Sequence, residues 1–287
     1  MAFTIAVLGI ATFSCLDAVM KGLVLKLGAF TALFWRNLAG IGVSGVVYAW
    51  RREPLPKAPA FKIHLIRGCL SAVMAFAFFW GLARIPIAQA VAITFVAPLL
   101  SIFLSAVLLH ERLSAKTLSA SLIAFAGVVV ILVGQWQSSL GESAFLGTAA
   151  VFFSAVCYAF NIVLMRKQAL VSGPIEVAFW QSVIVTAVTG LGAPLFATLV
   201  PVAQVSWIVL AALLAVVSLA LLAWAYARGE ASYLSTSEYT AFLWACAFGW
   251  LLFSERVTLA TLLGAAMIVG GCLLAAHRGD PPLESAT

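Results

Sequence analysis

Apolar residues occur along this chain in long continuous runs, separated by short polar or charged stretches. The runs do not alternate apolar and polar positions, as the ~10-residue strands of an outer-membrane barrel do. Helices are the other structure that satisfies every backbone hydrogen-bonding group in lipid, and a helical span needs about 20 apolar residues. The pattern therefore predicts an all-α polytopic membrane protein.

Ten helical spans account for these runs. Turn or charge signals separate them, for example Lys26–Gly28 and the proline-containing stretch Arg51–Lys62. The first run follows no basic segment, so we interpret it as a span and not as a cleaved signal peptide. The predicted spans are Ala2–Val24, Phe30–Trp50, Ile63–Leu82, Pro86–Leu109, Thr117–Gly134, Ala144–Leu164, Ile175–Leu199, Val205–Ala227, Ala231–Phe253 and Thr258–Ala276.

The composition excludes several classes of protein. Of the residues, 64% are hydrophobic and only 9% are charged, whereas about 25% of the residues of a soluble domain are charged. A nucleic-acid-binding protein would need a basic stripe. The cysteines show no CxxC spacing, histidines are scarce, and no nucleotide-binding P-loop is present, so we expect no metal, no cofactor and no ATP-driven motor.

Lysine and arginine residues are distributed unevenly between the two sides of the membrane. With the N-terminus inside, the cytoplasmic segments contain ten of them and the external segments contain only Lys26, Arg84 and Arg256. The positive-inside rule then predicts that both termini are cytoplasmic, including the segment after His277. An even number of spans follows.

The two halves of the chain resemble each other. A shift of 144 residues superposes Trp80 on Trp224, Arg84 on Arg228, Glu111-Arg112 on Glu255-Arg256 and Gly127 on Gly271, and nearer the N-terminus the shift is about 140. Each half holds five spans, an odd number, so the halves must cross the membrane in opposite orientations. We predict two inverted five-helix repeats, residues 1–140 and 141–287, that form one transport unit with its substrate site between them.

Each half also contains the same short motif before a glycine-rich last helix. It reads His110-Glu111-Arg112-Leu113-Ser114 in the first half and Ser254-Glu255-Arg256-Val257-Thr258 in the second, and Ala97-Pro98 precedes the first copy. Ten spans with these motifs resemble the drug/metabolite transporter (DMT) superfamily of the EamA type, and within it the YddG-like amino-acid exporters of bacteria. The second half departs from the pattern, because Phe242 stands where a proline is expected.

This resemblance implies a carrier of the bacterial inner membrane that exports amino acids or related metabolites by alternating access. Polar residues at membrane depth are costly in lipid and are therefore the candidates for its cavity. Asp17 and Lys21 lie four residues apart, on one face of the first helix. They either bind the ammonium and carboxylate groups of a zwitterion or neutralise each other. Tyr158 and Asn161 correspond to them in the second half, and either bind a polar substrate or tie helices together.

Glu238 lies in the most polar stretch within any predicted span, Ser235–Thr240, which also contains Tyr239. The repeat places Glu238 opposite Thr94. We interpret Glu238 as a cavity residue or a proton carrier; the alternative is a structural ion pair with a base such as Arg36.

Aromatic residues crowd the third helix, and we expect Phe78 and Phe79 to face the cavity, where they suit apolar side chains and cation–π contact. We interpret Arg36 as a tie between helices; the alternative is a bidentate contact with a substrate carboxylate. We interpret His64 and Arg67 as interface anchors, with a gate as the alternative, and Glu255 as a structural loop charge.

The sequence therefore predicts a secondary transporter that exports amino acids, aromatic or other apolar ones among them, and related small metabolites. Its partners are the small-molecule substrate and membrane lipids, without nucleic acid; a monomer is compatible with the pattern, and no feature identifies a coupling ion. The alternative is a drug or nucleotide-sugar carrier of the same superfamily. A channel would need a continuous polar stripe, and an intramembrane enzyme would need paired aspartates or Ser and His at depth, so we expect neither.

Overall fold

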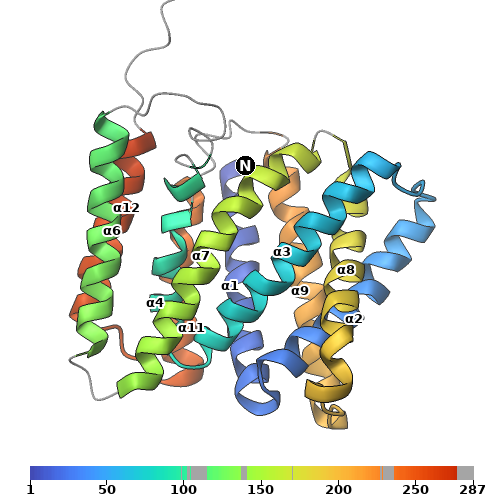
Figure 1. The fold of residues 1–287 in the computed structure, drawn as a ribbon, viewed down its shortest axis with the longest axis horizontal. Coiled ribbons are helices and arrows are strands. Elements are labelled where there is room, and N and C mark those ends of the chain that lie inside the picture. The colour runs from blue at the N-terminus through green and yellow to red at the C-terminus, as the bar shows by residue number, and fades with distance from the viewer. Residues whose placement is uncertain are drawn as a thin grey trace, which may run out of the picture.

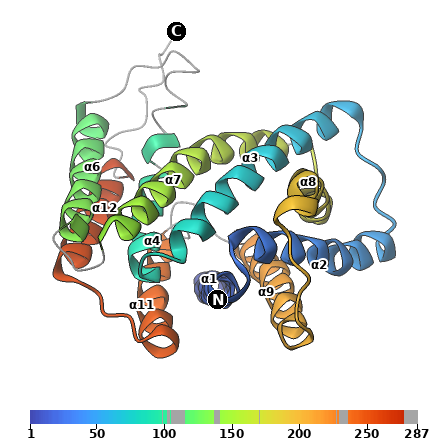
Figure 2. The same cartoon turned by 60° about the horizontal axis from the view of Figure 1, so that its bottom comes forward.

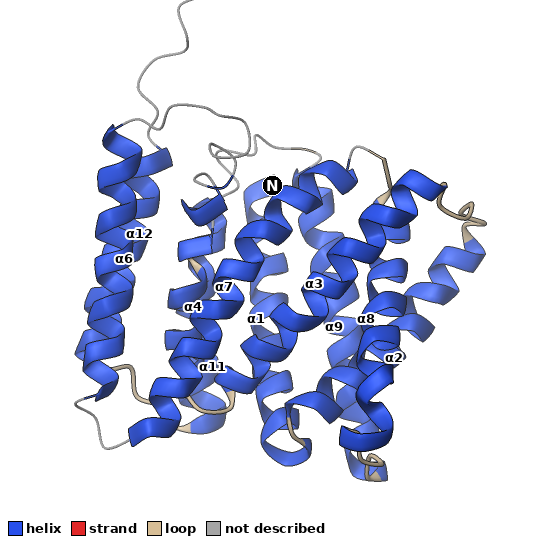
Figure 3. Cartoon of the chain, viewed as in Figure 1, coloured by secondary structure: helices blue, strands red, loops and turns tan. Residues whose placement is uncertain are grey.

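The computed structural model describes residues 1–97, 99–101, 104, 115–136, 141–169, 171–226, 228 and 236–276. Within these ranges the chain forms ten α-helices, one short 3-10 helix and no strand (Figure 3). The all-α prediction is confirmed. The predictions for the segment after His277 and for the motif His110–Ser114 concern residues outside the described ranges.

Most of the helices match the predicted spans to within a few residues. They are α1 (Ala2–Leu27), α2 (Ala29–Trp50), α3 (Ala58–Leu82), α4 (Ile87–Thr94), α6 (Ala115–Trp136), α7 (Gly141–Ala169), α8 (Pro174–Phe196), α9 (Val202–Tyr226), η1 (Thr236–Tyr239), α11 (Thr240–Phe253) and α12 (Leu259–Ala276). Six of them, α1, α2, α3, α7, α8 and α9, have the length and apolar composition of a membrane span. The chain is therefore a multi-pass membrane protein.

The helices begin and end at residues with the expected backbone chemistry. Gly28 separates α1 from α2 with a φ of +80°, a conformation that glycine adopts without steric cost, and its N–H donates to the Val24 carbonyl at 2.8 Å. Pro174 opens α8, where a missing N–H has no cost. Ser254 ends α11 in the left-handed region with a φ of +55°.

Two predicted spans differ from the observed helices. The span Pro86–Leu109 was predicted as one helix, but α4 ends at Thr94, and helical residues resume at Val96 after a turn at Phe95. By sequence, Pro98 has no N–H to donate to the Thr94 carbonyl. The described part of the span Ala231–Phe253 starts as the 3-10 helix η1 and becomes α-helical only at Thr240, whose hydroxyl donates to the Ser237 carbonyl at 2.6 Å. Such side-chain bonds compete with regular α-helix.

The helices lie side by side between two edges of the molecule. Figure 1 shows the N-terminus and the α2–α3 connection at the upper edge, and the α1–α2 turn at the lower edge. Figures 1 and 2 both place the α6–α12 pair at one end of the row and α2 with α8 at the other. Between these ends, α3 packs against α7, α1 against α9, and α4 against α11. The largest buried side chains of this middle part include Leu16, Met20, Leu33, Leu82 and Ile93.

Glycines allow α6 and α12 to approach each other closely. A Cβ atom on Gly127 would lie 2.6 Å from the Gly264 carbonyl oxygen, and one on Gly264 would lie 2.6 Å from the Gly127 carbonyl oxygen. Small residues at such crossings are typical of helix packing in membranes, where no hydrophobic driving force brings helices together.

We expect Gly264→Ala to destabilise the protein by about 1–3 kcal/mol, because the added methyl group meets rigid backbone at the crossing. Gly270→Ala is the matched control on the same helix: nothing lies within 4 Å of a Cβ there, so it should be neutral or slightly stabilising. Thermal unfolding in detergent measures both. Equal melting temperatures for the two variants would contradict the close crossing.

Candidate functional site

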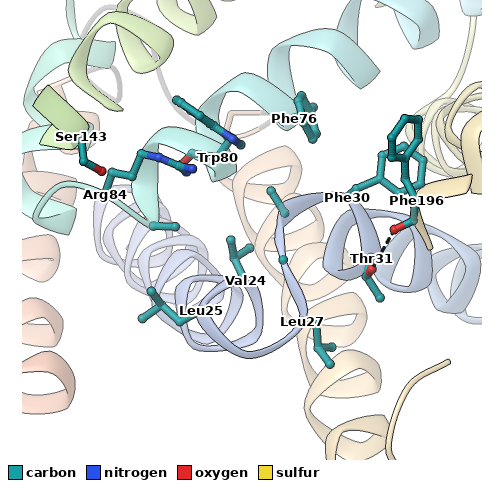
Figure 4. A pocket seen from close by; sticks show the side chains of 13 residues that line it. Val24, Leu25, Leu27, Phe30, Thr31, Phe76, Trp80, Arg84, Ser143 and Phe196 are labelled. Carbon is teal, nitrogen blue, oxygen red and sulfur yellow. Dashed lines mark hydrogen bonds between the residues drawn. The ribbon is translucent and has the colours of Figure 1, made fainter. Parts of the chain in front are cut away.

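A pocket of about 570 Å³ lies at the α1–α2 turn, near the lower edge of the molecule as drawn in Figure 1. The ends of α3 and α8 and the start of α7 complete its wall, so both halves of the chain contribute to it (Figure 4). The lining residues are Val24, Leu25, Leu27, Gly28, Ala29, Phe30, Thr31, Phe76, Trp80, Ala83, Arg84, Ser143 and Phe196.

Aromatic rings and one cation dominate the chemistry of this pocket. The ring centroid of Phe30 lies 6.4 Å from that of Phe76 and 5.6 Å from that of Phe196. The Arg84 guanidinium carbon lies 3.4 Å from the Trp80 ring centroid, and Nη1 donates to the Trp80 carbonyl at 2.7 Å. The pocket thus suits an amphipathic molecule. None of the predicted site residues lines it.

Asp17, Arg36 and Phe79 form a second polar group, on α1, α2 and α3. Asp17 is buried, and within the described residues its carboxylate accepts no hydrogen bond; the charge that acts on it is Arg36. The Arg36 guanidinium donates one hydrogen bond, to Asn37 Oδ1 at 3.1 Å, and lies 6.0 Å from the Phe79 ring centroid. Most of its five N–H donors are therefore available to a ligand.

This group lies further into the membrane than the pocket. Arg36 follows Thr31 of the pocket wall by five residues on α2, about 7.5 Å along a helix axis. Phe79 directly precedes Trp80 on α3, and its ring packs edge-on against Phe78 at 5.3 Å.

Lys21 does not pair with Asp17. Its ammonium forms an ion pair with Glu255 and also donates to the Ile85 carbonyl at 2.5 Å. The second carboxylate oxygen of Glu255 accepts from the Ile87 N–H at 2.8 Å, at the start of α4. Lys21 thus ties α1 to the α3–α4 and α11–α12 turns, and Glu255, which the sequence marks only as a loop charge, is its partner from the other half of the chain.

A third polar group centres on Arg67. Its Nε donates to Asn161 Oδ1 at 2.9 Å, and Asn161 Nδ2 donates to Ser71 Oγ at 2.6 Å, which joins α3 to α7. Tyr158, one turn earlier on α7, is 37% exposed and lies within electrostatic range of both Arg67 and Glu238. The structure therefore places Asn161 and Tyr158 near Arg67, a base that we interpreted as an anchor, and Glu238 within electrostatic range of Tyr158.

The remaining predicted residues lie elsewhere. Thr94 bonds within α4, from Oγ1 to the Val91 carbonyl at 2.7 Å. Tyr239 packs edge-on against Phe95 at 5.5 Å between ring centroids.

His64, at the start of α3, is a further buried group that sequence reasoning interpreted as an anchor. Nε2 lies 2.8 Å from Glu176 Oε1, and Nδ1 lies 2.6 Å from Gln168 Nε2. Gln168 in turn accepts a hydrogen bond from Arg67 Nη1. The signal that could have identified this network is the presence of His64 and Arg67, two polar groups three residues apart, inside an apolar helix.

Comparison with known proteins identifies a family. The model of the EamA-like transporter family matches residues 1–133 and 145–276. The chain is 28% identical over 280 residues to a riboflavin transporter of Rhizobium johnstonii, covering 92% of this chain and 87% of the relative. It is 27% identical over 276 residues to a pseudopaline exporter of Pseudomonas aeruginosa, covering 94% and 93%. A solved crystal structure matches with a TM-score of 0.63 at 25% identity over 96% of both chains.

We expect Glu255→Gln to lower the free energy of unfolding by about 3–5 kcal/mol, because it leaves the buried Lys21 ammonium without its counter-charge. The double variant Lys21→Met with Glu255→Gln should regain most of that loss. Arg256→Gln is the control, since Arg256 is exposed beside the pair. Denaturant titration in detergent measures these variants, Lys21→Met alone and the wild type. A double-variant loss equal to the sum of the two single-variant losses would contradict the pairing.

Proposed function

Since the chain belongs to the EamA-like transporter family, we propose that it is a secondary transporter that exports amino acids, apolar and aromatic ones among them, and related small metabolites. In this proposal the two halves rock about a site that contains Asp17, Arg36 and Phe79 on one side and Tyr158, Asn161 and Glu238 on the other. The bacterial cytoplasmic membrane is its location. The chain has no catalytic role in this proposal.

The packing of the helices supports two inverted five-helix repeats. Under the proposed repeat, α1 corresponds to α7, α2 to α8, α3 to α9, α4 to α11, and α6 to α12. If each helix is replaced by its counterpart in the other half, the observed contact between α3 and α7 becomes one between α9 and α1, which is also observed. In the same way, the contact between α2 and α9 becomes the observed contact between α8 and α3. The family model also matches in two segments that coincide with these halves.

The observation that supports the amino-acid assignment is the presence of two charges with few hydrogen bonds among the described residues, the buried Asp17 and the half-buried Arg36. A zwitterion that leaves water needs a partner for each of its charges. The Arg36 guanidinium suits a carboxylate in a bidentate contact, and Asp17 suits an ammonium group. Phe79 beside Arg36 and Phe78 next to it suit an apolar side chain. Because Lys21 is paired with Glu255, Arg36 is the base that would bind the substrate carboxylate.

The second candidate is a carrier of flat heteroaromatic metabolites. The aromatic pocket with its stacked Arg84–Trp80 pair favours it. One relative is named a riboflavin transporter, and another, from Rickettsia prowazekii, an S-adenosylmethionine uptake transporter at 25% identity over 202 residues, 70% of this chain and 63% of the relative. A nucleotide-sugar carrier has less support, because its phosphates would need more cations than Arg36 and Arg67 supply.

The decisive experiment is uptake by proteoliposomes made with pure protein. We expect saturable counterflow of one or more labelled apolar amino acids, and no flux of the corresponding amines or methyl esters, which each lack the carboxylate. Riboflavin and S-adenosylmethionine belong in the same panel. Saturable riboflavin flux without any amino-acid flux would replace the first candidate by the second.

Arg36→Gln should weaken the apparent affinity for amino acids by about tenfold or more, equivalent to about 1.4 kcal/mol or more, because the carboxylate loses its charged partner. Arg36→Lys should recover only part of the loss, since an ammonium cannot form the bidentate contact. Arg51→Gln, in the exposed α2–α3 connection, serves as the control. Unchanged affinity in a correctly inserted Arg36→Gln protein would remove Arg36 from the site.

The charge distribution supports cytoplasmic termini. In a background without the five native cysteines, single cysteines at Leu55 and Leu199 should label from opposite sides of the membrane, Leu55 from the cytoplasm. Both positions are exposed, 78% and 89% respectively. Labelling of both from the same side would contradict the proposed orientation.

A further inference from the structure

A buried histidine lies between two hydrogen-bond partners near the edge of the molecule that carries the N-terminus. The side chain of His64 on α3 has no exposed surface, and that of Glu176 on α8 is 12% exposed. Ser172, in the α7–α8 turn, donates to Glu176 Oε1 at 2.9 Å and lies 3.2 Å from His64 Nε2. Gln168 on α7 faces the other ring nitrogen. The cluster thus joins α3 of the first half to α7 and α8 of the second.

The hydrogen bonds fix the state of the histidine. Arg67 has only donors, so the atom of Gln168 that faces it must be the oxygen, and the Gln168 NH₂ group must face His64. Nδ1 of His64 therefore accepts, and the ring proton lies on Nε2, directed at the Glu176 carboxylate. In this arrangement the ring is neutral.

A second proton on the ring cannot be accommodated without a rearrangement. It would bond to Nδ1 and place an N–H donor against the NH₂ donors of Gln168. The Gln168 amide must then turn so that its oxygen accepts from Nδ1–H, and Arg67 Nη1 loses its acceptor. Protonation of His64 and the Arg67–Gln168 hydrogen bond are mutually exclusive.

We infer that His64, with Glu176 as its counter-charge, is a proton-binding site whose occupancy is coupled through Gln168 to the freedom of Arg67. The ligand is one proton from water, which adds to Nδ1 and leaves an imidazolium–carboxylate pair. Released from Gln168, Arg67 can bind an anionic group of a substrate near Tyr158 and Asn161. This last step rests on the proposed function; the proton site itself does not.

Thermodynamic linkage makes the coupling reciprocal. An anionic group that reaches Arg67 and draws it away from Gln168 promotes protonation of His64, and protonation promotes binding of that group. The charged groups that face His64 are Glu176 from α8 directly and Arg67 of its own helix through Gln168 of α7. The Trp180 ring of α8, 6.5 Å away between centroids, adds an apolar wall.

Nitrogen NMR of protein labelled with ¹⁵N-histidine tests the proton site without any substrate. The chain has three histidines, and His64→Gln assigns the signal. We expect the neutral Nε2–H form at alkaline pH and an imidazolium at acidic pH. A ring that stays neutral over the whole pH range in which the protein remains folded would overturn the proposal.

Gln168→Glu tests the coupling. A carboxylate at this position accepts from Arg67 and from Nδ1–H at once, so the midpoint should rise by about one to three pH units. Gln204→Glu, the same substitution at the start of α9 and at the opposite edge, should leave the midpoint unchanged. Equal midpoints in the two variants would overturn the role of Gln168.

Transport assays then test the use of the proton. Initial counterflow rates of the wild type should follow the same midpoint, His64→Gln should abolish that pH dependence, and His277→Gln should keep it. An unchanged profile in His64→Gln would overturn the link to transport. If no compound of the panel is transported, the proposed substrate class fails, while the NMR titration still decides the proton site.

Discussion

A charge within a membrane-spanning segment must find its partner inside the protein, since lipid offers none. In this chain the partners come from far away in the sequence. Lys21 of α1 is held by Glu255 after α11, Arg67 of α3 by Asn161 and Gln168 of α7, and His64 by Glu176 of α8. Each contact joins the first half of the chain to the second, so the polar groups within the spans also set how the halves pack. Asp17 and Arg36 differ, because both lie within the first half and, among the described residues, they form few hydrogen bonds.

These contacts occupy two levels of the molecule. The Lys21–Glu255 pair lies with the α3–α4 and α11–α12 turns, whereas the His64–Glu176 pair lies at the start of α3 and α8, at the opposite edge (Figure 1). The Asp17–Arg36 group and the Tyr158–Arg67 group belong to the length of helix between them. In the proposed alternating-access mechanism, opening at one edge must break the tie at that edge while the other persists. The two ties differ in chemistry, since one is a lysine–carboxylate pair and the other a histidine–carboxylate pair.

The elements of the fold follow from properties that the sequence displays locally. Uninterrupted apolar length predicts each span, and glycine, proline or charge predicts each turn, as at Gly28 and Pro174. The partners of the charged residues cannot be predicted from local sequence, because they depend on which helices pack together. The four-residue spacing predicted that Asp17 lies beside Lys21. In the structure, the Glu255 carboxylate, 234 positions away, binds Lys21. The charge that acts on Asp17 is Arg36 of the next helix. The sequence also did not predict the 3-10 helix η1. The hydroxyl groups that make this stretch polar also bond to its own backbone, as the Thr240 hydroxyl does to the Ser237 carbonyl. The aromatic pocket was missed because Trp80 and Arg84 resemble an ordinary interfacial belt until α8 brings Phe196 to face them.

The two halves place different chemistry at corresponding positions. Under the proposed repeat, Asp17 and Lys21 of α1 correspond to Tyr158 and Asn161 of α7, so two charged residues in one half match two neutral hydrogen-bonding residues in the other. A scaffold of two similar halves can thus present an asymmetric site, with ionic partners on one side and adaptable hydrogen-bond donors and acceptors on the other. Relatives that share this fold at about 25–28% identity carry names as different as riboflavin transporter and pseudopaline exporter. Such breadth is expected if the packing residues, such as Gly127 and Gly264, keep the helices in place while a few side chains at equivalent positions select the substrate.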